Sequence, residues 1–515
     1  MKKFLTFVLV LAMVLSVSSF AMAAGTVHKV GTYQELVEKL ASTGLADGDT
    51  IELTANIAYP TNGTGLINVT KSITIDGGAN KYGISGYGTR GSNKTTLAIN
   101  NNGTSQVTVT LKNLTIVNGV AGGRAIETRG GIAKLTIDNC NISCTGGASG
   151  SNYPQTLTIG GDQASLRAQV EIRNSNISNT THYPIITFNK VDMSIDNSTI
   201  SGYCAVFFRE ASSSNGSGGS VLTATGSTFN CPTNYDEPSN SFGVFPMRDT
   251  NITIKLTDCK VDATAAGAAT QSLVKTESGA TDHTFSLTIE GESEVKGDIL
   301  DVSAEALTTA ETKITGGTFT DDPSAYTGDT LVAEVGSVII VGEEAIEKAA
   351  NESQTPVNIK PISGTGDLDL DTTKDNQVVI TKDMKDKVTI NGQALEPVAS
   401  DAPQQIPSRP QTTAKPSTGN GISVKYNGGN SFSTSNPAVP TGVEIDGVPV
   451  SFNGTGSNFT VGCINPGAKW VTVRWNSTTV TTNFTPDGLV ECTTVSIPKT
   501  GDMPIWAAIA AFFGF

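Results

Sequence analysis

The chain has 515 residues and a formal net charge of −14, with 34 Lys and Arg against 48 Asp and Glu. Only 16% of the residues are charged and 54 are glycine, which excludes a coiled coil or a helical bundle. Hydrophobic residues make up 37%, enough for an extended β core, which excludes general disorder. The acidic balance, without a stripe of Lys and Arg, excludes a nucleic-acid partner.

The first 23 residues have the pattern of a signal peptide. Lys2 and Lys3 precede an apolar run at residues 4–17, and the small residues Ala21 and Ala23 follow. This arrangement is typical of a secretory signal, here with cleavage after Ala23. We therefore expect an exported protein.

A helix is predicted over residues 33–40. Thr32 and Glu35 form the capping-box pattern that begins a helix, and the apolar residues that follow give it one apolar face. The turn residues 47–49 then lead into a predicted strand at residues 50–53. Because a solenoid must cover its open end, we expect this helix to be the N-terminal cap of the repeat that follows.

A short template recurs through the middle of the chain. Residues 135–143, 170–178 and 193–201 read LTIDNCNIS, VEIRNSNIS and MSIDNSTIS. One apolar position, which we call the anchor, recurs about every 30 residues, within the range of solenoid repeats. The anchors are Ile75, Leu111, Ile137, Ile172, Ile195, Ala224, Leu256, Ile289 and Ile314.

A residue that tolerates the left-handed αL conformation stands two positions after each anchor. These residues are Gly77, Asn113, Asn139, Asn174, Asn197, Gly226, Asp258, Gly291 and Gly316. Five positions after the anchor a β-branched or aromatic residue usually follows: Ile116, Ile142, Ile177, Ile200, Phe229, Val261 and Phe319. A strand, an αL corner and a second strand in each repeat predict an all-β fold, a right-handed parallel β-helix of nine or ten coils within residues 24–330.

The repeat over residues 45–330 resembles the pectin-lyase-like superfamily of parallel β-helix proteins. That superfamily includes polysaccharide lyases and hydrolases, so the resemblance raises the question of catalysis. The sequence lacks the Asn-Thr-Asp, Gly-His-Gly and Arg-Ile-Lys sets of the polygalacturonases and the Arg-x-Pro-x-x-Arg of the pectate lyases. We therefore favour a protein without catalysis and keep a polysaccharide lyase or glycosidase as the alternative.

The best catalytic candidates form a column one residue after the anchor. Lys112, Asp138, Arg173 and Asp196 stand at this position on four successive repeats. An arginine between two carboxylates suits a lyase, in which a base acts beside groups that neutralise a uronate. Alternating charge is also what favourable pairs between neighbouring strands produce, and we favour this structural interpretation over a site at Asp138, Arg173 and Asp196.

Four tyrosines lie in the inserts between repeats. They are Tyr153, Tyr183, Tyr203 and Tyr235. Loops that leave the same part of successive coils share one flank of a solenoid, so these rings could stack on the sugars of a glycan. The alternative is that each tyrosine covers the core beneath its own loop.

The repeat is expected to end at a closing motif, and three further parts follow it. The segment at residues 316–326 resembles a closing motif of surface β-helix proteins of gut Gram-positive bacteria and should mark the last coil. We then predict a small α+β unit at residues 331–397, with a helix at residues 343–351, and a Pro-rich linker at residues 398–420. Short alternating strands with Gly and Pro turns at residues 421–495 predict a small β-sandwich.

Metal and disulfide sites have few candidates. Asp367, Asp369 and Asp371 alternate with leucines on one strand face and could bind calcium, but a solvated strand face is the favoured interpretation. The three histidines lie far apart and no CxxC spacing occurs, so zinc is not supported and no cofactor is expected. Cys463 and Cys492 are the disulfide candidate. Buried solenoid positions are expected for the rest: Cys140, Cys144, Cys204, Cys231 and Cys259.

The C-terminal residues 496–515 resemble the sorting signal of Gram-positive cell-wall proteins. Its motif is Ile497, Pro498, Lys499, Thr500 and Gly501, with Ile497 where that family usually has Leu. The resemblance implies that a sortase cleaves between Thr500 and Gly501 and joins Thr500 to an amine of the cell-wall peptidoglycan. The apolar run at residues 503–515 is shorter than the roughly 20 residues of a membrane span, so we expect a truncated signal.

Together these features predict a secreted surface protein attached to the cell wall, with sortase and peptidoglycan as partners. We expect it to act in adhesion or to bind an extracellular glycan or a host or matrix surface, without catalysis. The alternatives are a lyase or glycoside hydrolase acting on an acidic polysaccharide, and a passive surface stalk.

Overall fold

The computed structural model describes most of the chain between residues 25 and 483. The described ranges are 25–60, 65–90, 93–100, 106–128, 132–150, 152–160, 167–209, 219–231, 243–248, 251–264, 272–276, 283–301, 307–397, 403–406, 424–428, 431–445, 448–455, 457–461, 470–475 and 478–483. The predicted signal peptide, the disulfide candidates Cys463 and Cys492 and the sorting motif lie outside these ranges. The chain forms two compact units that divide between Arg409 and Pro410.

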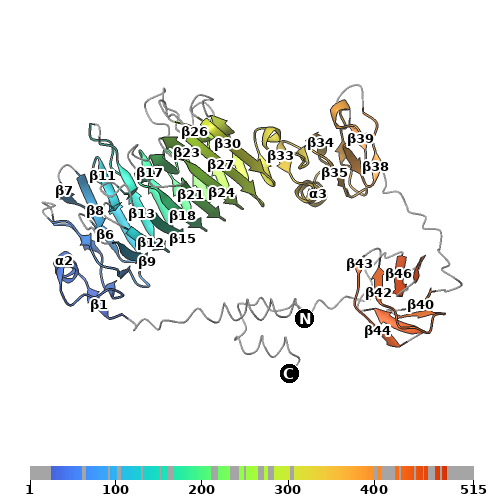
Figure 1. The fold of residues 1–515 in the computed structure, drawn as a ribbon, viewed down its shortest axis with the longest axis horizontal. Coiled ribbons are helices and arrows are strands. Elements are labelled where there is room, and N and C mark those ends of the chain that lie inside the picture. The colour runs from blue at the N-terminus through green and yellow to red at the C-terminus, as the bar shows by residue number, and fades with distance from the viewer. Residues whose placement is uncertain are drawn as a thin grey trace. The chain divides into compact units, whose positions relative to one another are not determined.

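The predicted cap helix is present as α2 (Tyr33–Ala41), at the blue end of Figure 1. The backbone N–H of Glu35 donates to Thr32 Oγ1 over 3.2 Å, and the N–H of Thr32 donates to Glu35 Oε2 over 3.1 Å. Leu36 and Leu40 are buried in the same core as the first coils. The capping box therefore begins a helix whose apolar face covers the end of the solenoid.

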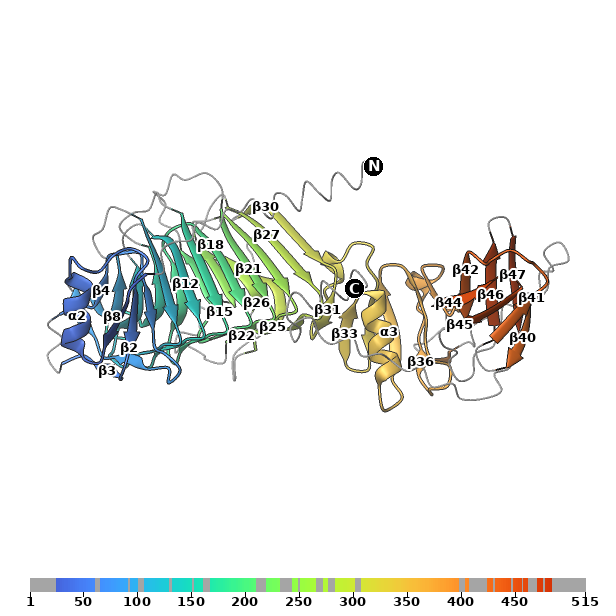
Figure 2. The same ribbon diagram turned by 90° about the horizontal axis from the view of Figure 1, so that it is seen from below.

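The first unit is a parallel β-helix built from three sheets, which we call A, B and C, seen from two sides in Figures 1 and 2. Sheet A contains β1 (Val27–Val30), β2 (Thr50–Leu53), β5 (Thr74–Asp76), β9 (Val107–Lys112), β12 (Ile132–Asp138), β15 (Ala168–Arg173), β18 (Val191–Asp196), β21 (Ser220–Thr225), β24 (Ile252–Thr257), β27 (His283–Glu290) and β30 (Leu307–Ile314).

Sheets B and C complete each coil. The solenoid strands of sheet B are β3 (Ile57–Ala58), β6 (Gly83–Ser85), β10 (Thr115–Asn118), β13 (Asn141–Cys144), β16 (Asn176–Asn179), β19 (Thr199–Ser201), β22 (Thr228–Asn230), β25 (Lys260–Asp262), β28 (Glu294–Lys296) and β31 (Gly317–Phe319). Those of sheet C are β4 (Asn68–Val69), β8 (Asn93–Ile99), β11 (Gly123–Thr128), β14 (Gln155–Ile159), β17 (Tyr183–Thr187), β20 (Val206–Arg209), β23 (Phe245–Arg248), β26 (Ser272–Thr276) and β29 (Asp298–Asp301), with β7 (Gly88–Arg90) antiparallel to β8.

The predicted anchors stack in register along sheet A. The nine anchors form eight register pairs between successive coils, from Ile75 with Leu111 through to Ile289 with Ile314. All nine are fully buried. The second predicted column, which includes Ile116 and Ile142, stacks in the same way in sheet B. Two apolar columns per coil therefore build one continuous core, and the predicted repeat is confirmed.

The predicted αL corners are present in seven of the nine coils. Asn113, Asn139, Asn174, Asn197, Gly226, Asp258 and Gly291 have φ between 47° and 69°. The prediction is wrong for Gly77 and Gly316, where the next residues, Gly78 and Gly317, adopt positive φ instead. Gly77 is needed for a different reason, because a Cβ there would lie 2.0 Å from the carbonyl oxygen of Asn113.

Polar ladders connect the corners along the axis. Asn139 Nδ2 donates to Asn113 Oδ1 over 2.7 Å, an amide contact between successive coils. One residue further on, backbone N–H groups donate to hydroxyls on the next coil: from Cys140 to Ser175, from Ser175 to Ser198, from Ser198 to Ser227 and from Cys259 to Ser293. Cysteine and serine therefore share one buried position of the coil, which explains Cys140 and Cys259.

The solenoid ends at the predicted closing motif. β31 pairs in parallel with β28 but antiparallel with β33 (Val338–Val341), so the coil pattern stops there. The α+β unit contains β33 together with β32 (Val332–Val335), α3 (Glu343–Glu352), β34 (Asn358–Ser363), β35 (Gly366–Leu368), β36 (Gln377–Val378), β37 (Val388–Ile390) and β38 (Gln393–Ala394). Short 3-10 helices lie at Ser324–Tyr326 and Lys382–Met384.

Part of the predicted linker belongs to this unit. β39 (Gln404–Gln405) pairs antiparallel with β36, and Ile406 packs against the core of the α+β unit. The Pro-rich composition favoured an extended chain, but the open edge of β36 offers backbone hydrogen bonds to such a segment. The expectation of a linker beginning at residue 398 is corrected for these residues.

The second unit is the predicted β-sandwich. One antiparallel sheet contains β40 (Val424–Gly428), β41 (Ser431–Thr434), β45 (Asn458–Val461) and β44 (Phe452–Thr455). The other contains β43 (Val448–Pro449), β42 (Gly442–Ile445), β46 (Trp470–Trp475) and β47 (Thr478–Asn483). Phe432 and Phe459 stack at 5.5 Å in the core that the two sheets share. In the described parts of both units, neither helix has the length and apolar composition of a transmembrane span.

Candidate functional site

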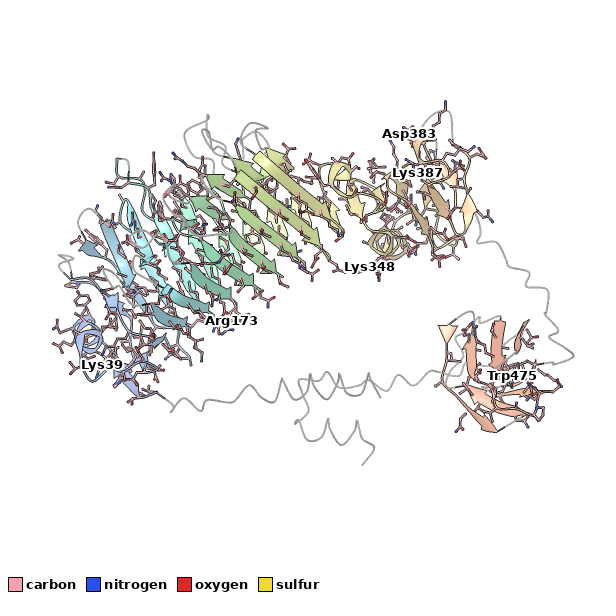
Figure 3. All side chains as sticks on the ribbon, viewed as in Figure 1. Lys39, Arg173, Lys348, Asp383, Lys387 and Trp475 are labelled. Carbon is pink, nitrogen blue, oxygen red and sulfur yellow. The ribbon has the colours of Figure 1, made fainter. Side chains whose placement is uncertain are left out.

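The predicted charged column is assembled on the outward face of sheet A. Lys112, Asp138, Arg173 and Asp196 are direct register partners on neighbouring strands. Figure 3 labels Arg173 at the surface of the solenoid. Strand pairing alone therefore brings these groups together, as the repeat predicted.

Contacts within the column neutralise its charges locally. Arg173 Nε lies 3.3 Å from Asp138 Oδ2, and Asn174 Nδ2 donates to Asp138 Oδ1 over 3.2 Å. The same arrangement occurs two coils earlier, where Lys112 and Asn113 both contact Asp76. A catalytic set is needed once, whereas a device that joins coils recurs, so this repetition favours a structural role.

Other outward charges also pair between coils. Lys134 with Glu171, Lys255 with Glu290 and Arg167 with Asp192 form ion pairs on sheet A. Sheet B has the pair Lys260 with Glu294 over 2.7 Å. These half-exposed pairs each contribute about 1 kcal/mol or less.

Aromatic side chains gather on the outer face of sheet C. Alternation along β17 and β20 places Ile185 and Phe208 in the solenoid core, and Ile186 and Phe207 on the opposite face. Tyr183, Tyr203 and Cys204 join Ile186 and Phe207 there, with Tyr153 and Phe188 packed against them. We call this group, with His182, the aromatic cluster.

The aromatic cluster centres on His182. Its ring stacks on that of Tyr153, with 4.2 Å between the ring centroids and an interplanar angle of 28°. The ring of Tyr183 meets it edge to face, with 3.8 Å between the centroids. Tyr203 lies 5.5 Å from His182 and 6.3 Å from Tyr183. Three of the four predicted tyrosines therefore meet, although Tyr183 is the first residue of β17 and does not lie in an insert as predicted. The fourth, Tyr235, lies outside the described residues.

Burial differs within the cluster. Tyr183 is 8% exposed and Tyr203 is 2% exposed, so their rings mainly cover the sheet. Tyr153 is only half-buried and follows the exposed Asn152, so it forms the accessible edge. Burial lowers the pKa of His182 to about 3. This imidazole is therefore neutral near pH 7 and packs as an aromatic ring.

A turn built around Asn179 positions His182. Asn179 Oδ1 accepts from the backbone N–H of His182 over 2.7 Å, and Asn179 Nδ2 donates to the carbonyl oxygens of Pro154 and Tyr183 over 3.1 Å. Asn118, two coils earlier in the same register column, makes equivalent bonds to Lys94 and Arg124. The repeat therefore fixes the backbone on which the insert presents its rings.

A buried polar group continues the same face toward the N-terminal coils. Glu127, Thr158, Ile186 and Phe207 are register partners in one outward row. Glu127 is 2% exposed. Its carboxylate accepts from Thr95 Oγ1 over 2.7 Å and from Asn93 Nδ2 over 3.1 Å, and it pairs with Arg124.

His182, Arg124 and Glu127 were not predicted from the sequence. His182 directly precedes the candidate Tyr183, which was a usable signal, but the three histidines were assessed only as metal ligands. Arg124 and Glu127 are the two charged residues of β11, a strand of the solenoid, and an unpaired charge at such a position would be costly. That cost could have indicated that the two residues form a pair.

The described residues bring no three His, Cys, Asp or Glu side chains together as a metal site. Asp367 Oδ1 accepts from Thr389 Oγ1 over 2.7 Å, and Asp371 Oδ1 accepts from the backbone N–H of Thr373 over 2.8 Å. Leu368 and Leu370 are buried beside these aspartates, as the alternation predicted, but β35 ends at Leu368, so only Asp367 lies on a strand and the predicted strand face is wrong for Asp369 and Asp371. Asp369 is exposed, and its backbone N–H donates to Glu347 Oε1 over 2.6 Å.

The five solenoid cysteines are free and buried, as predicted. Burial raises the pKa of Cys140 to about 11 and that of Cys144 to about 12. Burial also raises the pKa of the thiols of Cys204, Cys231 and Cys259. These are properties of unreactive structural thiols.

The sequence matches no protein-family model, and comparisons with curated proteins and with solved structures give no significant match. The assignment as a parallel β-helix therefore rests on the pairing of the three sheets.

Proposed function

We propose that the chain is a secreted cell-surface protein that binds an extracellular glycan without chemical turnover, through the outer face of sheet C. The observation that carries the proposal is the aromatic cluster, in which Tyr153 is half-buried and its ring stacks on His182. Stacking on such a ring suits the apolar face of a sugar. The exposed Asn152 beside it provides an amide for hydrogen bonds to hydroxyls.

The charged column supports binding over catalysis. Asp138 and Arg173 contact each other, and the same arrangement recurs at Asp76 and Lys112. These residues also lie on the outward face of a sheet whose register alone brings them together. A lyase or hydrolase at this column remains the alternative function.

Retention on a glycan array tests the proposal. We expect the full chain to be retained by at least one glycan and Tyr153→Ala to lose about twofold to tenfold in affinity, since stacking against an aromatic ring is worth about 0.5–1.5 kcal/mol. Tyr82→Ala, which removes another half-buried tyrosine of the same solenoid away from sheet C, should bind like the wild type.

Other outcomes favour the alternatives. Release of unsaturated or reducing sugar ends that Arg173→Ala or Asp196→Ala abolishes would establish an enzyme and overturn the proposal. If the chain is neither retained by any glycan nor releases sugar ends, the passive surface stalk is the favoured function.

Attachment to the cell wall is a separate part of the proposal. It rests on the motif at residues 497–501, where Thr500 is the residue that a sortase would join to peptidoglycan. We expect Thr500→Ala to release the protein into the medium of sortase-competent cells. Retention of Thr500→Ala on the wall would contradict this attachment.

A further inference from the structure

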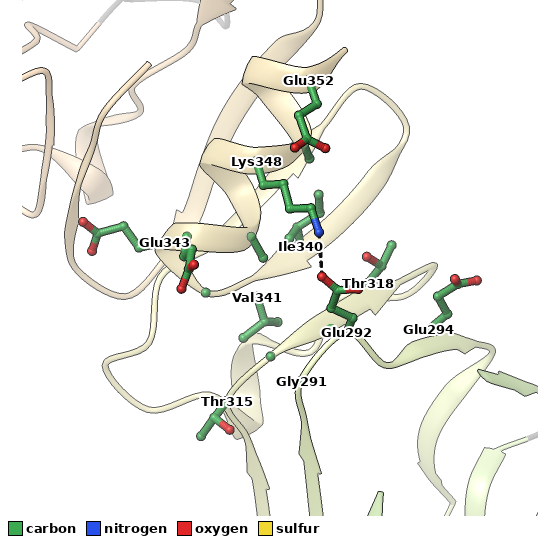
Figure 4. A pocket seen from close by; sticks show the side chains of 16 residues that line it. Gly291, Glu292, Glu294, Thr315, Thr318, Ile340, Val341, Glu343, Lys348 and Glu352 are labelled. Carbon is green, nitrogen blue, oxygen red and sulfur yellow. Dashed lines mark hydrogen bonds and ion pairs between the residues drawn. The ribbon is translucent and has the colours of Figure 1, made fainter. Parts of the chain in front are cut away.

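A groove separates the last coil of the solenoid from helix α3. Its volume is about 690 Å³, within the range typical of ligand-binding clefts. One wall is formed by Glu292, Glu294 and residues 315–318, the other by α3, and Ile340 and Val341 lie between the two walls (Figure 4). Both walls belong to the first compact unit and are joined by the pairing of β31 with β33.

The groove combines an apolar floor with an acidic rim. Ala345 and Ala349 of α3 are half-buried and supply apolar surface next to the buried Ile340 and Val341. Five glutamates are among the residues that line the groove: Glu292, Glu294, Glu343, Glu344 and Glu352. Lys348 is the one cation among the described residues that line the groove. The groove therefore has a formal charge of −4.

Lys348 shows which chemistry fits this groove. Its Nζ crosses from α3 to the solenoid and lies 2.6 Å from Glu292 Oε1 (Figure 4). The bond to Glu292, with the nearby Glu352 and Glu344, raises the pKa of Lys348. The aliphatic stem of Lys348 thus extends from α3 and places the ammonium group among these carboxylates.

Glu352 is not explained by the stability of α3 itself. Glu343 and Glu344 lie in the first turn, where negative charge is favourable for the helix dipole. Glu352 lies in the last turn, where negative charge is unfavourable, and that turn contains no basic residue. The ion pairs among the described residues do not include Glu343, Glu344 or Glu352.

We propose that this groove is a docking site for an extended, lysine-bearing peptide segment of a partner protein. The acidic rim complements its ammonium groups, and the apolar floor accommodates its aliphatic stems. Lys348 already occupies one such position and therefore competes with the partner. The proposal does not depend on glycan binding, which would use sheet C.

Fluorescence anisotropy with the full chain tests it, using a labelled hexapeptide of alternating alanine and lysine as the probe. We expect Glu344→Gln with Glu352→Gln to weaken binding at least fivefold. Lys348→Met should tighten it at least threefold, because the competing ammonium is removed. Lys385→Met is the matched control, since it changes the net charge equally but pairs with Glu396 outside the groove. Its affinity should stay within twofold of the wild type.

A steric variant separates the groove from general electrostatic attraction. Ala345→Trp fills the groove without changing charge and should abolish binding in a protein whose circular dichroism is unchanged. The proposal is overturned if the probe does not bind, if Lys348→Met and Lys385→Met have equal effects, or if a folded Ala345→Trp variant binds normally.

Discussion

The neutral His182 at the centre of the aromatic cluster should make folding stability depend on pH. Burial lowers its pKa from 6.5 to about 3, so the unfolded chain binds a proton below pH 6.5 that the folded chain does not bind. The contribution of neutral His182 to the free energy of unfolding is therefore fully present above the unfolded pKa of 6.5 and is lost as the pH falls below it. Each pH unit in this window costs about 1.4 kcal/mol, so lowering the pH from about 7.5 to about 5 should remove about 2 kcal/mol.

Urea unfolding of the wild type and of His182→Phe at both pH values measures this effect. Phenylalanine keeps a ring for Tyr153 and Tyr183 to pack against but cannot be protonated. Far-UV circular dichroism follows the β-helix, whereas tryptophan fluorescence follows the sandwich, in which Trp475 is buried, and serves as an internal control. His182→Phe should lose about 2 kcal/mol less than the wild type between the two pH values. Parallel losses in both proteins would refute the linkage to His182.

Three further predictions concern the corners, the charged column and the buried cysteines of the coils. Asn139→Ala should lower the free energy of unfolding by about 1–2 kcal/mol, and Asn139→Gly by less, because only alanine is strained at the φ of 55° there; equal losses would contradict this explanation. Arg173→Ala removes a half-exposed ion pair and should change stability by about 1 kcal/mol or less in the same assay, so a loss of several kcal/mol would refute a local ladder. Cys140 and Cys144 should resist a maleimide reagent near pH 7.5 until urea unfolds the chain, because their raised pKa values leave few thiolates; mass spectrometry of the native protein checks this.

The solenoid could be predicted because its signals are local and repeated. An anchor such as Ile172 and a corner such as Asn174 are separated by two residues, and each coil repeats the comparison. Gly77 misled the prediction because Gly78 follows it, and composition alone does not show which of two glycines has positive φ. At Gly77 the requirement comes from the carbonyl oxygen of Asn113 on the next coil, a contact between residues distant in sequence.

The aromatic cluster could be predicted only in part. Tyr153, Tyr183 and Tyr203 were identified as sharing a flank, but their burial depends on how inserts of different length fold over sheet C. The central position of His182 depends on the turn that Asn179 holds, which is a tertiary arrangement. Aromatic residues at variable spacing predict that the rings lie close together, whereas the exposure of each ring depends on the tertiary fold around it.

Both proposed binding surfaces lie where the coil template is interrupted. On sheets A and B, outward residues such as Asp138 and Lys260 contact residues of neighbouring coils, so each is already engaged in holding the stack together. Inserts beside sheet C and the switch from parallel to antiparallel pairing at β31 remove that constraint locally. There the side chains can form an aromatic cluster or an acidic groove without breaking a ladder. In a solenoid of this kind, ligand binding is therefore expected at breaks in the repeat, and substitutions there should alter binding with little effect on the stability of the stack.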